Sequence, residues 1–433
     1  MSKVRTIVLL AAALVAMPAA RAELTIEITE GVTDPIPIAI VPFGWSGIGQ
    51  APFDVAELVA ADLKRSGRFT PMPRTDMIEL PTRGEEVEID DWRLLRNDFV
   101  VVGQLQPGAE GRYTIQFELM NVLNGQKLLL NRQPATTASL RAASHRVADI
   151  IFEKITGIRG AFSTRIAYIS VEGQAPARRY KLIVADSDGE NPRIAAQSSE
   201  PIMSPAWSPD GQSLAYVSFE SRVASIYAQM LRTGERTRVS ARAGINGAPA
   251  WSPDGRRLAL TLSHKDGNLD VYVLNLGDQV LTRITDDNAI DTEPSWAADG
   301  KSLYFTSDRS GSPQIYRVAP NSGERPTRVT FEGSYNARPR VSPDGNTLAM
   351  VTLDNGAYRI AALDLKNGGS RVLTQGRLDE SPSFAPNGAE LIYATQDRGR
   401  GVLATVSVDG NVQQRLASES DIREPVWAPF APQ

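Results

Sequence analysis

The chain has 433 residues, a length that predicts two or three domains of about 150 residues each. Hydrophobic residues make up 42% and charged residues 22% of the sequence, a composition that indicates a folded protein and argues against a fibrous or disordered one. The net charge of −4 argues against nucleic acid or an anionic membrane as a partner. Cysteine is absent and only two histidines occur, which excludes disulfides and thiolate chemistry and disfavours metal or acid–base chemistry.

The first 22 residues predict a secretory signal peptide. Lys3 and Arg5 precede an apolar run from Ile7 to Met17, and Ala-Arg-Ala at residues 20–22 matches a cleavage site. The run is shorter than the ~20 residues needed to span a bilayer, so neither a membrane anchor nor direct membrane insertion is expected. Cleavage after Ala22 would leave 43 basic and 50 acidic residues in an exported chain, for which we expect a bacterial periplasm.

Residues 23–30 predict an extended segment at the new N-terminus. The sequence Glu-Leu-Thr-Ile-Glu-Ile-Thr-Glu alternates polar and apolar residues and places Leu24, Ile26 and Ile28 on one side. Such a segment either forms an edge strand of its own domain or adds itself to an exposed sheet edge elsewhere.

Residues 23–160 as a whole predict a small α/β domain. An apolar strand at 37–42 is followed by an amphipathic helix at 53–65, which ends at Gly67. Further strands are predicted at 99–102, 113–120 and 127–131, the last two joined by a hairpin at Asn124-Gly125. A second amphipathic helix at 140–156 ends at Gly157, and residues 157–163 form the expected linker.

Residues 161–433 contain an internal repeat that predicts a six-bladed β-propeller. The motif Pro-x-Trp-Ser-Pro-Asp-Gly occurs six times with variations, and its aromatic position advances in steps of 44, 45, 45, 43 and 43 residues. Periods of this length are typical of propeller blades, which have four strands each. The Pro and Gly of the motif favour a tight turn between the first and second strands of each blade. The six copies begin at Pro205, Pro249, Pro294, Pro339, Pro382 and Pro425.

The two ends of the repeat region predict ring closure. Residues 166–170 match the second strand of a blade but have no motif before them, whereas the last copy, at 425–427, has no hairpin after it. Pairing these two fragments would complete one blade and satisfy two open sheet edges. The predicted architecture is therefore an α/β N-terminal domain followed by an all-β propeller that the C-terminal strand closes.

Groups with the chemistry of a catalytic or metal site are few. His145 and His264 have no second histidine or cysteine at metal-ligand spacing, and no G-x-S-x-G nucleophile motif or phosphate-binding loop occurs. Residues 186–191 resemble a calcium loop only faintly, since Gly189 stands at the fourth position and Gln197 at the twelfth. The repeated aromatic residues are expected to pack between blades rather than to bind sugars. We expect no catalytic residues, no cofactor and no metal.

The loops that enter the innermost strands are the candidate binding site. We expect the residues immediately before the motif prolines to converge on one mouth of the central channel. Six equivalent turns have no folding reason to differ so much in charge, which favours a binding surface over a merely solvated rim. These residues are Ser204, Ala248, Glu293, Arg338, Ser381 and Glu424.

These features resemble the TolB family, the periplasmic component of the bacterial Tol-Pal system. The resemblance rests on the six repeats, on Val41-Pro-Phe43 and on residues 55–63, 128–131 and 153–157, and it covers essentially all of the chain after the signal peptide. Ala297-Ala298, Val341 and Asn387 depart from the motif only in turn or packing positions. The resemblance implies a non-enzymatic adaptor that supports outer-membrane integrity and invagination during cell division.

The resemblance also implies partners and their contact residues. The lipoprotein Pal is expected to bind one propeller face, as are colicins or other bacteriocins, whereas TolA is expected to bind the N-terminal segment. By position, the Pal- and colicin-binding rim comprises Asn246, Ala248, Thr292, Glu293, Arg338, Asp379, Glu380 and Arg423. The TolA-binding segment comprises Glu23, Leu24, Thr25, Ile26, Glu27 and Ile28. A periplasmic hydrolase and a glycan-binding propeller stay open as alternative functions.

Overall fold

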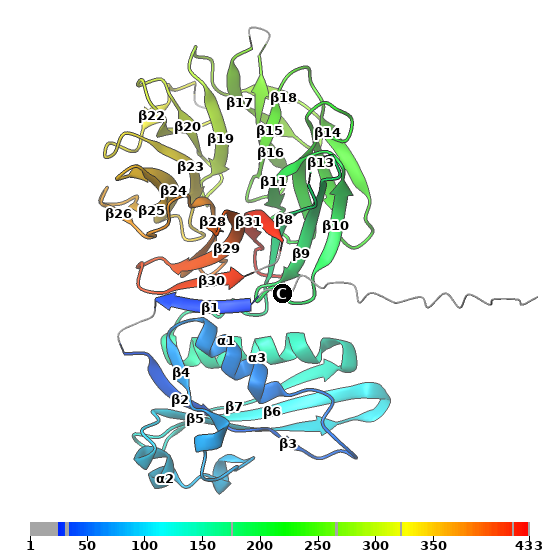
Figure 1. Ribbon diagram of the computed structural model, residues 1–433, viewed down its shortest axis with the longest axis vertical. Helices are drawn as coiled ribbons and strands as arrows, with labels where there is room; N and C mark the ends of the chain where they lie inside the picture. The colour runs from blue at the N-terminus through cyan, green and yellow to red at the C-terminus, as the bar shows by residue number, and fades with distance from the viewer. Residues whose placement is uncertain are drawn as a thin grey trace, which may run out of the picture.

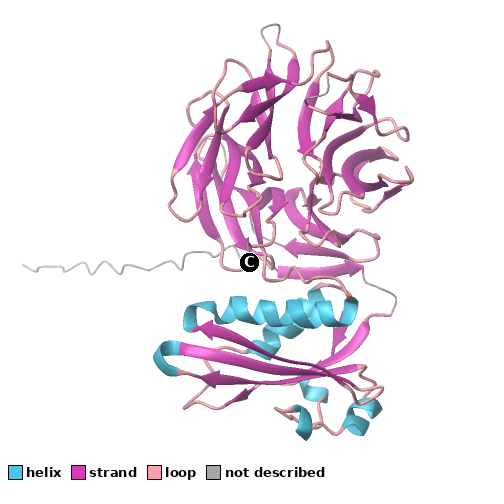
Figure 2. Cartoon of the chain, turned by 180° about the vertical axis from the view of Figure 1, so that it is seen from behind, coloured by secondary structure: helices cyan, strands magenta, loops and turns pink. Residues whose placement is uncertain are grey.

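The computed structural model describes residues 25–30, 34–174, 176–264, 267–320, 323–417 and 420–431. The predicted signal peptide, together with Glu23 and Leu24, lies outside the described residues. An α/β domain at the N-terminal end adjoins a β-propeller, and its two longer helices lie between its own sheet and the propeller (Figures 1 and 2).

The N-terminal domain is built on a mixed sheet of six strands in the order β4-β2-β5-β6-β7, with β3 paired to β5. β2 runs parallel to β4 and β5, whereas β5, β6 and β7 form an antiparallel meander that confirms the predicted hairpin. The strands are β2 (Ile36–Ile40), β3 (Gly44–Trp45), β4 (Phe69–Pro71), β5 (Phe99–Pro107), β6 (Arg112–Asn121) and β7 (Lys127–Thr136).

Helices α1 (Val55–Arg65) and α3 (Leu140–Thr156) confirm the two predicted helices. α1 begins after Asp54 because the carboxylate of Asp54 accepts a hydrogen bond from the Glu57 backbone N–H at 3.0 Å. α3 ends at Gly157, whose φ of 74° is a conformation that glycine adopts without strain. Both helices pack their apolar sides onto one face of the sheet in a single core.

A third helix, α2 (Ile89–Leu94), covers the opposite face of the sheet through the fully buried Trp92. The amphipathic pattern did not reveal α2, because a helix of six residues is too short to show a helical period.

The propeller has six sheets, and its blades are written here from the innermost strand outward. The first three blades are β11 (Ile202–Trp207), β12 (Ser213–Ser218), β13 (Ser225–Met230), β14 (Arg236–Ser240); β15 (Asn246–Trp251), β16 (Arg257–Ser263), β17 (Leu269–Asn275), β18 (Leu281–Arg283); and β19 (Asp291–Trp296), β20 (Leu303–Ser307), β21 (Gln314–Val318), β22 (Thr327–Arg328). The last three are β23 (Asn336–Val341), β24 (Thr347–Asp354), β25 (Ala357–Asp364), β26 (Ser370–Val372); β27 (Glu380–Phe384), β28 (Glu390–Asp397), β29 (Arg400–Ser407), β30 (Gln413–Ala417); and β31 (Asp421–Trp427), β8 (Arg165–Glu172), β9 (Arg179–Asp186), β10 (Arg193–Ser198).

The sixth blade confirms the predicted closure of the ring. The C-terminal strand β31 is its innermost strand and pairs antiparallel with β8, so that Trp427 lies opposite Ile166. The blade thus joins the two ends of the repeat region, and β31 covers the edge of β8 that would otherwise be unpaired.

The N-terminal segment does not pair within its own domain. Strand β1 (Thr25–Glu30) pairs antiparallel with β30, the outermost strand of the fifth blade, and extends that sheet to five strands. The interpretation of this segment as an edge strand of its own domain is therefore wrong. The alternation of polar and apolar residues correctly indicates a strand. It does not identify the partner strand, because the backbone hydrogen bonds that pair a strand are the same at every sheet edge.

Candidate functional site

Each innermost strand bends at the residue immediately before its motif proline. In all six blades this residue has a positive φ, between 44° and 55°, and the register of the strand is irregular at this point. A left-handed conformation costs an L-residue about 1–2 kcal/mol, and none of the six residues is glycine. Strain of this kind persists only where the surrounding structure holds it, and it is concentrated at functional sites. The six residues are Ser204, Ala248, Glu293, Arg338, Ser381 and Glu424, called the rim residues below.

Hydrogen bonds between neighbouring blades hold several rim residues in place. Glu293 Oε1 accepts from Arg338 Nε at 2.7 Å, and Glu293 Oε2 accepts from the Arg338 backbone N–H at 3.1 Å. The Arg338 guanidinium also donates to the Ser381 hydroxyl and lies 3.9 Å from Glu380. Glu424 accepts a hydrogen bond from the backbone N–H of Ser204. The rim is therefore ordered before any partner arrives, which reduces the entropy lost on binding.

The rim carries both signs of charge in a partly buried setting. Burial alone would lower the pKa of Arg338, but the carboxylates of Glu293, Glu424 and Glu380 outweigh it and raise that pKa. Burial raises the pKa of Glu424, and the nearby positive charge of Arg338 offsets only part of this effect. Arg338 is thus a permanent cation surrounded by acidic groups. This arrangement of charges would orient a partner that carries complementary charges.

The structure places the sequence-predicted rim residues in two groups. Ala248, Thr292, Glu293 and Arg338 are partly exposed and line the channel at its mouth, and the partly exposed Glu380 lies 3.9 Å from Arg338. Arg423 is exposed nearby, and its guanidinium forms an ion pair with Asp421 at 2.6 Å.

Asn246 and Asp379 differ from these residues because they are buried. Asn246 is 1% exposed, and its amide group bonds to the Ser240 hydroxyl at 2.6 Å and to the Arg242 carbonyl at 2.7 Å. Asp379 is 0% exposed and accepts from the Thr395 hydroxyl at 2.5 Å. These two side chains hold the loops that present the rim.

A cavity of about 630 Å³ follows the propeller axis and is lined by all six innermost strands. The motif tryptophans border it but pack mainly between blades, as predicted. Trp207 Nε1 donates to the Val426 carbonyl of the preceding blade at 3.2 Å, and Trp296 Nε1 donates to the Ala250 carbonyl in the same way at 3.2 Å. These rings therefore join blades instead of forming a platform for sugars.

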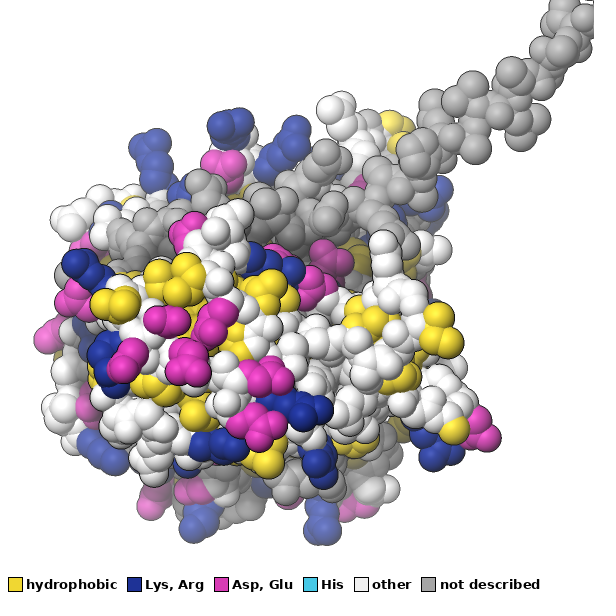
Figure 3. Space-filling model, turned by 90° about the horizontal axis from the view of Figure 1, so that it is seen from below, with side chains coloured by type: hydrophobic (Ala, Val, Ile, Leu, Met, Phe, Trp, Pro, Cys, Tyr) yellow, Lys and Arg dark blue, Asp and Glu magenta, His cyan; other side chains and the backbone are white. Residues whose placement is uncertain are grey.

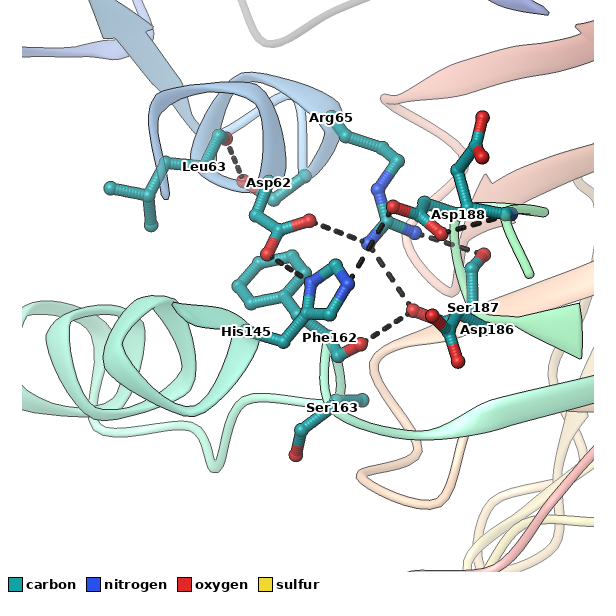
Figure 4. Close-up of polar contacts among 12 residues, drawn as sticks. Asp62, Leu63, Arg65, His145, Phe162, Ser163, Asp186, Ser187 and Asp188 are labelled. Atoms are coloured by element: carbon teal, nitrogen blue, oxygen red, sulfur yellow. Dashed lines mark hydrogen bonds and ion pairs between the residues drawn. The ribbon is translucent and has the colours of Figure 1, made fainter. Parts of the chain in front are cut away.

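The two domains meet at a buried cluster of charged residues (Figure 4). His145 of α3 is 2% exposed, and its Nδ1 lies 2.6 Å from Asp62 Oδ2 on α1. On the other side, His145 Nε2 lies 3.6 Å from Asp188 Oδ2, in the turn between β9 and β10 of the propeller. Arg65 donates to the Ser187 carbonyl at 3.0 Å, and Arg141 pairs with Asp188. Residues from both domains thus form one network.

Asp62, His145 and Asp188 also have the donor types of a metal site, with potential ligand atoms within 4.8 Å of one another. Two guanidiniums occupy the same carboxylates, since Arg65 donates to Asp62 at 3.0 Å and Arg141 pairs with Asp188. We therefore interpret the cluster as an ion-pair network between domains. Sequence reasoning missed it because its members are 83 and 43 residues apart and none belongs to a short motif.

The N-terminal domain contacts the propeller on the face opposite the rim. Asn387, in the turn after the first strand of the fifth blade, donates to the Arg159 carbonyl at 2.9 Å. The rim residues lie near the start of each innermost strand, whereas Asn387 lies in the turn after the end of such a strand, so the two are at opposite ends of the blade. The rim is therefore left open by the N-terminal domain.

The far end of the N-terminal domain is acidic. Residues 74–98 contain eight acidic and four basic residues, a net charge as large as that of the whole chain. Figure 3 shows acidic and hydrophobic side chains gathered on part of this face. Within residues 74–98, Ile78, Leu80 and Leu94 are 63%, 59% and 81% exposed. This end of the molecule would repel anionic lipid and nucleic acid.

Comparison with known families assigns both parts of the chain. Residues 24–128 match the family described as the TolB amino-terminal domain, and residues 152–431 match the family described as the TolB beta propeller domain. The chain belongs to the TolB family. The predicted family resemblance is confirmed by these matches.

Individual relatives agree with this assignment over nearly the full length. The chain is 54% identical to the Tol-Pal system protein TolB of Thioalkalivibrio sulfidiphilus over 414 residues, which cover 95% of each chain. It is 49% identical to the protein of the same name from Xanthomonas euvesicatoria pv. vesicatoria, covering 94% of this chain and 93% of the relative. The crystal structure of TolB from Acinetobacter baumannii superposes with a TM-score of 0.88 at 40% identity, covering 94% of this chain and 100% of the other. None of the described helices has both the length and the apolar character needed to cross a membrane.

Proposed function

We propose that the protein is a non-enzymatic periplasmic adaptor of the Tol-Pal system, acting in outer-membrane integrity and cell division. The observation that carries this proposal is the rim, where six strained residues at equivalent positions surround an open channel mouth. Its relatives from two bacterial genera bear the name Tol-Pal system protein TolB, which supports the assignment to this system.

The rim is the proposed binding face for Pal, and for colicins or other bacteriocins. Thr292, Glu293, Arg338 and Glu380 supply hydroxyl, carboxylate and guanidinium groups that are partly exposed and already ordered. Such preordered charged groups favour specificity and fast association. Asn246 and Asp379 take part indirectly, by holding the loops, since both are buried.

The N-terminal segment is the proposed binding element for TolA. In the structure the backbone of Thr25 to Glu30 is engaged with β30, from Thr25 opposite Ala417 to Glu30 opposite Gln413. A segment that pairs through its backbone with one sheet edge can pair with another edge when it is released. Binding at the rim would control TolA access if it shifts the equilibrium between docked and released states.

Two variants of the processed chain, which lacks the predicted signal peptide at residues 1–22, test the two proposed interfaces separately. Removal of residues 23–33 should abolish binding of purified TolA and spare binding of Pal. Glu293→Lys should weaken Pal binding by about 2 kcal/mol, roughly thirtyfold, and spare TolA. Titration calorimetry with each partner measures both affinities, and the melting temperature of each variant checks its fold. TolA binding that survives the truncation would refute the role of the segment, and an unchanged Pal affinity in Glu293→Lys would refute the rim.

A further inference from the structure

One residue breaks the sixfold pattern inside the propeller channel. The position between the motif proline and the aromatic residue lines the axial cavity in every blade. Five blades place a small or medium-sized, uncharged side chain there, whereas the fourth places an arginine. In blade order these residues are Ala206, Ala250, Ser295, Arg340, Ser383 and Val426.

Arg340 differs from its neighbour Arg338 in how its charge is used. Arg338 is held by Glu293 at 2.7 Å and by the Ser381 hydroxyl. Arg340 Nη1 donates to the carbonyl of the adjacent Pro339 at 2.8 Å, and no carboxylate oxygen of the described residues lies within 4.0 Å of its guanidinium. Most of the donors of this guanidinium are therefore available to a ligand in the cavity.

The electrostatic setting of Arg340 favours an incoming anion. Burial lowers the pKa of Arg340, and the more distant Glu293 and Glu424 compensate only in part. A cation that its surroundings compensate incompletely gains from an anion placed beside it, because the two charges interact in a water-poor channel.

Two serines stand at the positions equivalent to Arg340 in the two neighbouring blades. Ser295 belongs to the preceding blade and Ser383 to the following one, and both line the cavity. Ser383 Oγ accepts from the Trp427 backbone N–H at 3.0 Å, which leaves its hydroxyl hydrogen available to donate. A guanidinium matches the planar, bidentate geometry of a carboxylate, and serine hydroxyl groups that line the same cavity can donate further hydrogen bonds to it.

We propose that the propeller channel binds a compact monocarboxylate, held through its carboxylate by Arg340 with Ser295 and Ser383 as further donors. The carboxylates of Glu293 and Glu424 at the rim end disfavour doubly charged anions such as phosphate. The opposite end of the cavity is lined by Pro253, Pro343 and Phe430 and suits an apolar body. The carboxylate belongs either to a free organic acid or to the C-terminus of a peptide.

Titration calorimetry of the full processed chain at constant ionic strength tests the proposal. The probes are propionate, hexanoate and inorganic phosphate, and for the peptide source acetyl-trialanine as its free acid and as its amide. Saturable binding of a carboxylate probe, with weaker binding of phosphate and of the amide, is expected. The source is identified by which carboxylate probe binds, free acid or peptide.

Arg340→Ser is the decisive variant, because serine already stands at the equivalent position of two blades. Arg340→Ser should weaken carboxylate binding at least about tenfold. Arg340→Lys keeps the positive charge but loses the planar guanidinium, so its affinity should lie between those of the wild type and of Arg340→Ser. Arg256→Ser removes an exposed arginine from a turn outside the cavity and should leave affinity within about twofold. The proposal is overturned if the wild-type protein binds no carboxylate probe saturably, if phosphate binds more tightly, or if Arg340→Ser or Arg340→Lys binds as well as the wild type.

Discussion

Glu293 holds both the side chain and the backbone of Arg338, a residue of the next blade. One carboxylate oxygen accepts from Arg338 Nε at 2.7 Å, and the other accepts from the backbone N–H of the same arginine at 3.1 Å. Because Arg338 has a φ of 54°, this carboxylate stabilises a strained conformation as well as a charge. The rim is thus stiffened across blades and not only within them.

Replacing Glu293 by alanine should lower the stability of the propeller by about 1–3 kcal/mol, since it leaves the partly buried Arg338 without its main acceptor. A double-mutant cycle with Arg338→Ala should give a coupling of about 1 kcal/mol or more, because the two residues share their hydrogen bonds. Thermal unfolding of the four proteins measures this coupling. Additive losses would show that the two residues stabilise the rim independently.

Ala248→Gly should raise stability by up to about 1 kcal/mol. Ala248 has a φ of 44°, and glycine adopts this region without the steric penalty of a Cβ atom, although it loses more backbone entropy on folding. Ala250→Gly, two residues along the same strand, is the matched control and should lower stability, because Ala250 is not among the residues with positive φ. Equal effects of the two substitutions on the melting temperature would contradict a stored strain at the rim.

The repeat motif predicted the blades, the closure of the ring and the packing of the tryptophans, because each follows from a fixed spacing of proline, aromatic residue and glycine. It could not predict the positive φ of the rim residues, since Glu293 and Arg338 carry no local preference for that conformation. The inter-blade hydrogen bonds between Glu293 and Arg338 join residues that are 45 positions apart in the chain.

The sequence also could not predict which polar residues near the rim are buried. Asn246 and Asp379 are polar residues, which usually lie in solvent, but their buried side chains accept hydrogen bonds from the backbone N–H groups of Arg242 and Gly376 in the loops. Addition of residues 25–30 to a sheet edge elsewhere was one of the two predicted alternatives, but the sequence could not identify β30 as that edge, because strand addition relies on backbone groups that every residue has.

The cluster between the domains should make their contact sensitive to acid. Burial alone would raise the pKa of Asp188, but the guanidinium of Arg65, together with the neighbouring His145 and Arg141, holds that pKa below its usual value of 3.8. A carboxyl group with a lowered pKa stabilises the folded state above its unfolded pKa, and this stabilisation is lost as the pH falls through its lower, folded pKa. Asp188→Asn should therefore destabilise the protein by about 2–3 kcal/mol at pH 7, and this difference should shrink below about pH 4.

Unfolding of wild type and Asp188→Asn between pH 3 and pH 7 measures this dependence. Glu153→Gln, an exposed substitution on α3, serves as the control and should leave stability within about 0.5 kcal/mol at every pH. A difference between wild type and Asp188→Asn that stays constant down to pH 3 would mean that the Asp188 charge does not stabilise the domain contact.

Docking of β1 on the fifth blade predicts a pattern of hydrogen exchange that also tests coupling to the rim. Within Gln413 to Ala417 on β30, the amides that point toward β1 should exchange faster when residues 23–33 are removed, because the outer edge of β30 then faces water. The outermost strand of the fourth blade, β26, ends its sheet with or without β1 and should not change. If rim binding releases β1, saturating Pal should accelerate exchange in Thr25 to Glu30 of the intact chain and leave β26 unaffected. If the exchange rates on β30 do not change with the truncation, β1 does not dock there in solution. If the exchange rates in β1 do not change when Pal is added, only the coupling to the rim is disproved.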